Sequence, residues 1–195
     1  MQEVFYEETA TIQNQEKAAK KYNFFKLISR ICYILFTLYA IILFLFFGPD
    51  PNGAIFSIIF SFLPLVIFLV TAILCGRYKN TLYVEYDYTF ISGSIRIAKV
   101  VKDYRRKTVI NFDTYNIEKI GRYNSSTYNK YQIMPGINKL ILTQNLIASE
   151  NKDFYYLVVN VNSKKNLLVL ECSDQFIVNI LKFSKKTILE ERFFN

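Results

Sequence analysis

The strongest constraint on this chain is a pair of long apolar stretches, Ile31–Phe47 and Ala54–Cys75, in which no side chain carries a formal charge. As helices they would cover about 25 Å and about 33 Å, against a hydrocarbon core of roughly 30 Å. Asp50 is the one charged residue between them. Uncharged stretches of this length are unusual in a soluble domain, so we predict two membrane-spanning helices at about residues 27–47 and 54–76.

The residues between and inside these stretches predict a helical hairpin. The connection Gly48–Gly53 contains two prolines and two glycines, which end a helix and favour a turn. Pro64 lies in the middle of the second stretch and should kink that helix without ending it. A cleaved signal peptide would have a shorter apolar region followed by a small-residue cleavage site, and Gly-Pro-Asp-Pro follows Phe47 instead.

Lysine and arginine beside the spans predict their orientation, because cytoplasmic flanks are enriched in these residues. The flank before the first span carries four of them, the connecting turn carries none, and the flank after the second span carries two. They are Lys20, Lys21, Lys26, Arg30, Arg77 and Lys79. We therefore expect a multi-pass protein of the cell membrane with both termini in the cytoplasm.

The chain then divides into an N-terminal cytoplasmic segment (1–23), a two-helix transmembrane hairpin (24–76) and a cytoplasmic domain (77–195). A helix that leads into the first span should begin near Asn14. The first ten residues fit a strand, a short helix or a solvated tail, and the sequence does not choose among these three.

After Arg77 the apolar pattern changes to the period of two that is typical of half-buried strands. In the first strand, apolar and aromatic residues alternate with Glu85 and Asp87, whose carboxylates we expect on a solvated face. Seven strands are predicted, at about residues 82–90, 95–101, 108–112, 115–123, 137–144, 154–161 and 166–172. The loop Asn162–Lys165 should join the last two as a hairpin.

A helix is predicted to end the chain. Ser173 is a candidate N-cap, and Asp174 is well placed at the positive end of the helix dipole. Apolar residues then recur at helical spacing, which predicts an amphipathic helix over residues 174–191 that covers an open end of the sheet. The predicted fold class is α+β: a transmembrane α-helical hairpin followed by a seven-stranded antiparallel β-sandwich or barrel with a C-terminal helix.

Seven strands followed by one helix is the order of the pleckstrin-homology (PH) fold, and the chain resembles small two-span membrane proteins of clostridia-type bacteria that carry a cytoplasmic PH-like domain. The resemblance rests on Met1–Glu8, Tyr86–Phe90, the Ser92-Gly93 turn, the basic corner Tyr104–Lys107 and the Ile-rich segment Val109–Ile120. It implies this architecture and a membrane location, and no enzymatic role. The Tyr123–Gly136 stretch departs from it, because a compact barrel needs a shorter loop.

The sequence offers no catalytic, cofactor-binding or metal-binding constellation. It contains no His and no nucleotide-binding, metalloprotease, hydrolase or calcium-loop motif. Cys32, Cys75 and Cys172 form no CxxC pair, so we expect buried structural thiols. We therefore expect a protein that is not an enzyme and uses no cofactor. A membrane-bound enzyme of unknown class is the less favoured alternative.

A basic cluster in the cytoplasmic domain is the best candidate for a binding site, and the net charge of +8 lies almost entirely after Arg77. The cluster consists of Lys99, Lys102, Arg105, Arg106 and Lys107. Beside a membrane such a cluster attracts anionic headgroups, although a solvated strand corner is the simpler explanation. Most aromatic residues lie in the spans or at alternating strand positions, so we expect no nucleic-acid partner.

Two functions follow as hypotheses. The first is a binding or scaffold module at the cytoplasmic membrane surface, which presents an edge strand or a helix groove to a protein partner in the membrane. The alternative is recognition of anionic lipid headgroups through the basic cluster. The oligomeric state has no signature in the sequence.

Overall fold

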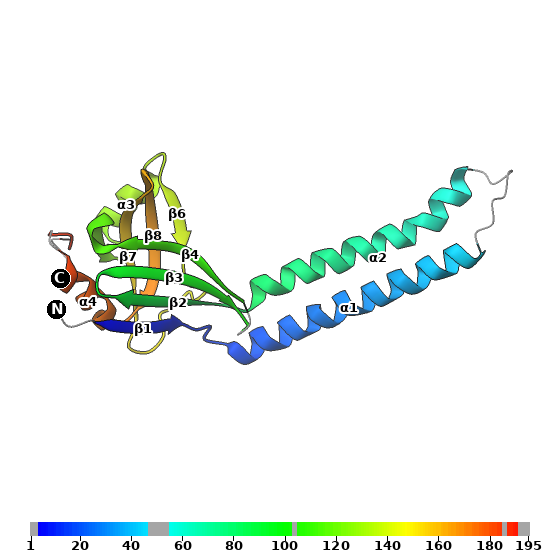
Figure 1. Cartoon of the computed structure of the whole chain (residues 1–195), viewed down its shortest axis with the longest axis horizontal. Helices are drawn as coiled ribbons and strands as arrows, with labels where there is room; N and C mark the ends of the chain where they lie inside the picture. The colour runs from blue at the N-terminus through cyan, green and yellow to red at the C-terminus, as the bar shows by residue number, and fades with distance from the viewer. Residues whose placement is uncertain (1–3, 47–54, 103–104, 185–186, 191–195) are drawn as a thin grey trace. The chain divides into compact units, whose positions relative to one another are not determined.

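The computed structural model describes residues 4–46, 55–102, 105–184 and 187–190, and it divides into two compact units (Figure 1). One unit contains residues 14–83 and is helical, and the other contains residues 1–13 together with 84–195. The described residues that precede the helices, 4–13, therefore belong to the same unit as the strands that follow the helices. The helical unit is an insertion between the first and second strands of the β unit.

The helical unit consists of α1 (Gln15–Phe46) and α2 (Ile55–Leu82), and Pro64 lies inside α2 as the sequence indicates. The Ser29 hydroxyl donates a hydrogen bond of 2.9 Å to the Ala72 carbonyl. A Cβ at Gly76 would lie 3.3 Å from the same Ser29 oxygen. Small residues therefore let the two helices approach closely, which is how helices associate in a bilayer.

Few of the described side chains of either helix are buried. Both are long and apolar enough to cross a membrane, and only 6% of the apolar window of each is buried. A core helix of a soluble protein would bury most of that window. The prediction of two long apolar helices is confirmed.

The β unit contains two four-stranded sheets, and Figure 1 shows their strands crossing at a steep angle. The first sheet, in order, is β1 (Phe5–Ala10), β2 (Val84–Ile91), β3 (Ser94–Val101) and β4 (Arg105–Asp113), all antiparallel. The second sheet, in order, is β5 (Ile117–Arg122), β7 (Asp153–Val161), β8 (Lys164–Cys172) and β6 (Asn138–Ile141). The short 3-10 helix η1 (Thr114–Asn116) connects them.

The expected seven-stranded antiparallel sandwich is therefore corrected. All seven predicted strands form, but the residues that the structure describes contain eight, because β1 pairs with β2 at the edge of the first sheet. β6 also runs parallel to β8. The predicted hairpin loop between β7 and β8 is a two-residue turn at Asn162 and Ser163, whose φ values of 51° and 59° match a type I′ turn.

The core lies between the two sheets and is closed by α4 (Asp174–Phe183). Side chains such as Tyr88, Phe90 and Leu157 are fully buried there, and Phe176 of α4 packs among them. Ser173 is the N-cap of α4, since its hydroxyl accepts a hydrogen bond from the Phe176 amide. This confirms the predicted start of the helix.

The predicted end of that helix is wrong. α4 ends at Phe183, and residues 187–190 are extended instead of helical. The Ile120 amide donates to the Ile188 carbonyl, and the Glu190 amide donates to the Ile120 carbonyl, each at 2.8 Å. Ile188 keeps the helical spacing in the sequence, but it is buried because this segment adds to the free edge of β5.

The Tyr123–Gly136 stretch, for which the sequence predicts a long loop, contains α3 (Ser126–Ile133). The Ser125 hydroxyl caps the helix by accepting from the Tyr128 amide at 3.1 Å. Tyr128 packs against Tyr156 on the outer face of the second sheet, with their ring centres 5.7 Å apart. Burial raises the pKa of Tyr128 to about 12, with a smaller effect from neighbouring Tyr123.

Candidate functional site

The predicted basic cluster lies on the β3–β4 hairpin, and the register of this hairpin decides how its side chains are arranged. The cross-strand pairs are Lys99–Lys107, Val100–Arg106 and Val101–Arg105. Opposed residues in an antiparallel pair share a face of the sheet, and neighbours along a strand alternate between faces. Lys99, Arg105 and Lys107 therefore share one face, and Arg106 lies on the other. The structure brings together three of the five predicted residues.

Arg106 has a structural partner on its own face of the sheet. Its Nε lies 3.0 Å from Asp87 Oδ2 of β2, in an ion pair that does not have hydrogen-bond geometry. The Thr9 hydroxyl of β1 donates to Asp87 Oδ1 at 2.8 Å. To reach Asp87 from its position opposite Val100, the Arg106 side chain crosses β3, so its aliphatic stem covers apolar surface there.

This arrangement corrects the prediction that Glu85 and Asp87 lie on a solvated face. Their exposed fractions are 8% and 5%. Asp87 is buried because Thr9 of the added strand β1 and Arg106 of β4 close over it from both sides. An alternation pattern within β2 contains no information about either partner.

Lys99, Arg105 and Lys107 form what we call the basic triad. Among the residues that the structure describes, none forms an ion pair with a member of the triad. Arg105 and Lys107 are exposed and Lys99 is half-buried. Lys102, the remaining member of the predicted cluster, lies in the turn at the tip of the hairpin with a φ of 41°.

The basic triad lies at the end of the first sheet from which the chain passes to the helical unit. Val84, the first residue of β2 after α2, pairs with Val101, which in turn pairs with Arg105. Ala10, the last residue of β1 before α1, pairs with Tyr86, which pairs with Lys99. Both connections to the helices and the basic triad therefore share one end of the sheet.

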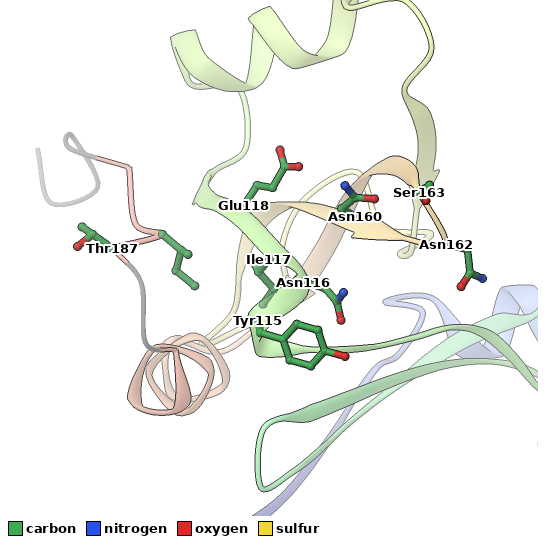
Figure 2. A pocket seen from close by; sticks show the side chains of 9 residues that line it. Tyr115, Asn116, Ile117, Glu118, Asn160, Asn162, Ser163 and Thr187 are labelled. Carbon is green, nitrogen blue, oxygen red and sulfur yellow. The ribbon is translucent and has the colours of Figure 1, made fainter.

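A polar hollow of about 690 Å³ lies elsewhere in the β unit, at the start of β5 (Figure 2). Figure 2 shows its side chains spread over three places, the start of β5 with the turn before it, the end of β7 with the β7–β8 turn, and Thr187 after α4, without a common point toward which they converge. Its acidic residue, Glu118, is paired with Lys165 at 2.6 Å. Small-molecule sites are mostly apolar with a few convergent polar groups, so this hollow is a poor candidate.

A buried carboxylate that the sequence patterns did not single out anchors the connection between β6 and β7. Glu171 of β8 is fully buried and accepts hydrogen bonds from Thr143, Asn145 and Ser149. Burial alone would raise the pKa of Glu171, but these hydrogen bonds outweigh it, and the pKa lies below its usual value. The sequence does contain a signal for this buried carboxylate, because Glu171 directly follows the apolar run of β8. A strand buried on both faces has no solvated position for such a residue.

No metal site is formed within the described ranges, where no group of three or more His, Cys, Asp or Glu side chains comes together. The three cysteines are free thiols. Cys172 is buried as expected, whereas Cys32 and Cys75 are half-buried, which corrects the expectation for these two. Burial is the main reason why the pKa of Cys172 is raised well above its usual value, which makes it a poor nucleophile.

Two crossed sheets closed by a C-terminal helix, with a helical hairpin inserted after the first strand, define the class of protein: a PH-like β domain fused to two long apolar helices. Comparison with known families agrees, because residues 10–190 match the bacterial PH-like domain family DUF6106. The chain belongs to this family. The matched range includes both helices. Neither the curated proteins nor the solved structures contain a match.

Proposed function

We propose that this protein is a non-enzymatic binding module anchored in the cell membrane by α1 and α2, and that its basic triad binds anionic lipid headgroups at the cytoplasmic surface. The observation that carries the proposal is the position of the triad at the end of the sheet that connects to both helices. No described carboxylate pairs with the three cations of the triad, so they are available to attract an anionic membrane surface.

Aromatic residues two to three turns into α1 and near the end of α2 support the membrane part of the proposal. Phe25 and Tyr78 pack edge to face with ring centres 4.9 Å apart, and Lys79 Nζ lies 5.8 Å from the ring centre of Tyr22. Aromatic rings and lysines are enriched at the level of the lipid headgroups. Residues 22–25 and 78 therefore mark where the cytoplasmic interface would cross the hairpin.

The chain itself limits how far the basic triad can lie from this interface. Four of the six steps from Tyr78 to Val84 lie in α2, so this path is at most about 13 Å long, and Arg105 lies two strand spacings of about 4.8 Å further across the sheet. Long basic side chains and a Debye length of about 8 Å at physiological ionic strength cover much of that distance. Each basic residue near an anionic surface contributes about 1 kcal/mol, so three contribute roughly 3 kcal/mol.

The register offers a way to test lipid binding without the spans. Because Ala10 pairs with Tyr86, the ends left by removing residues 14–83 lie close together, and a short Gly-Ser linker can join them. Circular dichroism would first confirm that this soluble variant folds. In sedimentation with vesicles rich in anionic lipid, it should bind at low salt. Replacing Lys99, Arg105 and Lys107 by Gln should weaken binding by roughly 100-fold.

The matched control removes the same charge from other surfaces by replacing Lys119, Lys130 and Lys139 with Gln. An equal loss in the control would show that net charge alone drives binding and would refute a site at the basic triad. The same variants made in the full-length protein, reconstituted and cross-linked to lipid, provide a second measurement if the shortened chain does not fold. A single stoichiometric protein partner captured without lipid preference would favour the scaffold function instead.

A further inference from the structure

The segment that follows α4 lies along the edge of β5. Leu189 forms a parallel bridge with Ile120 there. The Ile120 amide donates to the Ile188 carbonyl and the Glu190 amide donates to the Ile120 carbonyl, so the described backbone hydrogen bonds of this segment to β5 involve one residue of the strand. A sheet edge offers amides and carbonyls to an extended chain that reaches it. The edge of β5 therefore accepts an added strand, and it does so in the parallel direction.

Two side chains of the segment occupy specific positions on this edge. Ile188 is 2% exposed and belongs to the core between the sheets. Glu190 is 9% exposed, and its Oε2 accepts a hydrogen bond of 3.2 Å from the Tyr156 hydroxyl. Gly121 lies against this carboxylate, with which a Cβ at that position would collide. The edge thus has an apolar position and, two residues further along the added strand, a position that accommodates a carboxylate.

The polar hollow at the start of β5 adjoins the segment on the same edge. It has a volume of about 690 Å³, and its lining includes residues 115–118 together with Thr187 and Ile188 of the segment (Figure 2). The side chains of the hollow do not converge on a small molecule, but an added strand is held by a row of backbone groups and needs no such point. The hollow therefore leaves room on this edge for an extended chain longer than residues 187–190.

α4 is anchored by contacts that do not involve the segment. The Thr114 hydroxyl donates to the Phe183 carbonyl at 3.3 Å, and the rings of Phe183 and Phe90 pack edge to face with centres 5.3 Å apart. Parallel strand pairing is also slightly less stable per residue than antiparallel pairing. Residues 187–190 can therefore leave the edge while the helix that closes the core stays in place.

We propose that this edge of β5 is a binding site for an extended segment of a partner protein, and that residues 187–190 occupy it when the partner is absent. The partner segment has an apolar residue two positions before a carboxylate, because the positions of Ile188 and Glu190 select that pattern. A tethered segment competes at a millimolar effective concentration, so the partner needs further contacts, and the hollow has room for them. The inference uses contacts within the β unit only and does not rest on lipid binding.

Opening the site in the full-length protein tests the inference. Ile188→Asp together with Glu190→Ala removes both anchoring side chains and gives what we call the released variant. The probe is a fluorescein-labelled Gly-Ser-Thr-Ile-Leu-Glu-Gly-Ser peptide, whose binding to the detergent-solubilised protein is followed by fluorescence anisotropy. We expect the released variant to bind the probe at least about tenfold more tightly than the native protein, because no tethered segment competes.

Matched changes locate the bound probe. Adding Tyr156→Phe to the released variant should weaken binding about tenfold, because the hydrogen bond to the probe carboxylate is lost. The same change should not affect a probe that has Ala in place of Glu. A control probe with Ser in place of Ile and Ala in place of Glu should not bind. Loss of binding on replacing Lys99, Arg105 and Lys107 by Gln would place the acidic probe at the basic triad and refute the inference.

A released variant that is folded by circular dichroism but does not bind the probe refutes the inference, as does equal binding of the probe and the control probe. A native dimer that the two substitutions dissociate would assign the edge to a second copy of this chain, also against it. If the released variant does not fold, hydrogen exchange of the native protein with excess probe decides. The Glu190 amide should then lose protection while the Ile120 amide keeps it, and unchanged protection at Glu190 would refute the exchange of strands.

Discussion

Lys99 on β3 and Lys107 on β4 are direct cross-strand partners, and no described carboxylate forms an ion pair with either of them. Like charges placed directly opposite each other destabilise a sheet by roughly 0.2–1 kcal/mol. A Glu at either position would remove this cost, so the stability of the fold does not explain the pair. An anionic ligand that lies against both ammonium groups would explain it.

Lys107→Glu should therefore stabilise the protein and weaken its binding to anionic membranes. The introduced carboxylate would face Lys99, which we expect to raise the free energy of unfolding by about 0.5 kcal/mol. Reversing one charge in the basic triad should reduce binding to anionic vesicles at least about tenfold at low salt. Urea unfolding and vesicle sedimentation measure the two effects separately.

Lys130→Glu on α3 is the control for that prediction, because it makes the same change of charge on an exposed residue of a different surface. It should leave vesicle binding nearly unchanged, and it should lower the free energy of unfolding by about 0.3–1 kcal/mol, because a carboxylate replaces a cation in the last turn of α3. If Lys107→Glu raised stability while vesicle binding stayed constant, the lysine pair would be a surface feature without a role in lipid binding.

Glu171 should make stability depend on pH in the acid range. Its pKa is lowered in the folded protein, so its contribution is complete above the ordinary carboxylate pKa of about 4.3 and is lost as the pH falls through the lowered value. Glu171→Gln should cost roughly 1.5–3 kcal/mol near neutral pH, because charge-assisted hydrogen bonds from Asn145 and Ser149 are lost.

Urea unfolding followed by circular dichroism at about pH 6 and about pH 3 checks this prediction. The difference between the native protein and Glu171→Gln should be large at the higher pH and smaller at the lower one. A constant difference would mean that the carboxylate charge of Glu171 is not what holds the β6–β7 connection.

Much of this architecture is predictable from the sequence because the relevant signals are local. An uncharged stretch predicts a long apolar helix by its length alone. Alternation predicts β2, and short apolar runs bounded by turn residues predict strands such as β7 and β8. The N-cap at Ser173 and the β7–β8 turn also depend on neighbouring residues only. The basic cluster was found in the same way.

The elements that the sequence did not predict depend on contacts between distant residues. β1 is hard to recognise in the sequence because its pattern is not clearly apolar. Glu8 occupies one of the partly buried positions of this strand, where an apolar residue would be expected. Glu8 is satisfied there because the Ser173 amide and hydroxyl, far along the chain, donate to it. The conformation of the β6–β7 connection, which exposes Leu146 and Ile147, likewise depends on hydrogen bonds to Glu171 and to residues 11–13. α3 was missed because only Tyr128 of its residues is buried.

Gly121→Ala should destabilise the protein through a steric clash. A Cβ at this position would collide with Glu190 Oε2 and lie 2.5 Å from Tyr156 Cε1, and Tyr156 is fully buried. Overpacking of this kind costs roughly 1–3 kcal/mol. Part of the cost should disappear in a Glu190→Ala background, where one of the two clashing groups is absent; thermal unfolding of the single and double variants measures this coupling.

Gly136→Ala provides the comparison, since Gly136 has no neighbour within 4 Å but has a φ of +79°. Its cost of about 1 kcal/mol comes from backbone conformation and should be the same with or without Glu190→Ala. Additive effects of Gly121→Ala and Glu190→Ala would contradict the steric explanation.

The orientation of the spans can be tested with single cysteines. After Cys32, Cys75 and Cys172 are replaced by Ser or Ala, Asn52→Cys places one thiol in the connection between the spans, and Ser163→Cys places one in the exposed β7–β8 turn. The basic residues lie before the first span and after the second, and the connection between the spans has none. We therefore expect a membrane-impermeant maleimide to label the Asn52→Cys variant in intact cells. The Ser163→Cys variant should be labelled only after permeabilisation. The reverse pattern would place the β unit outside the cell and would remove the basis for contact between the basic triad and the anionic cytoplasmic leaflet.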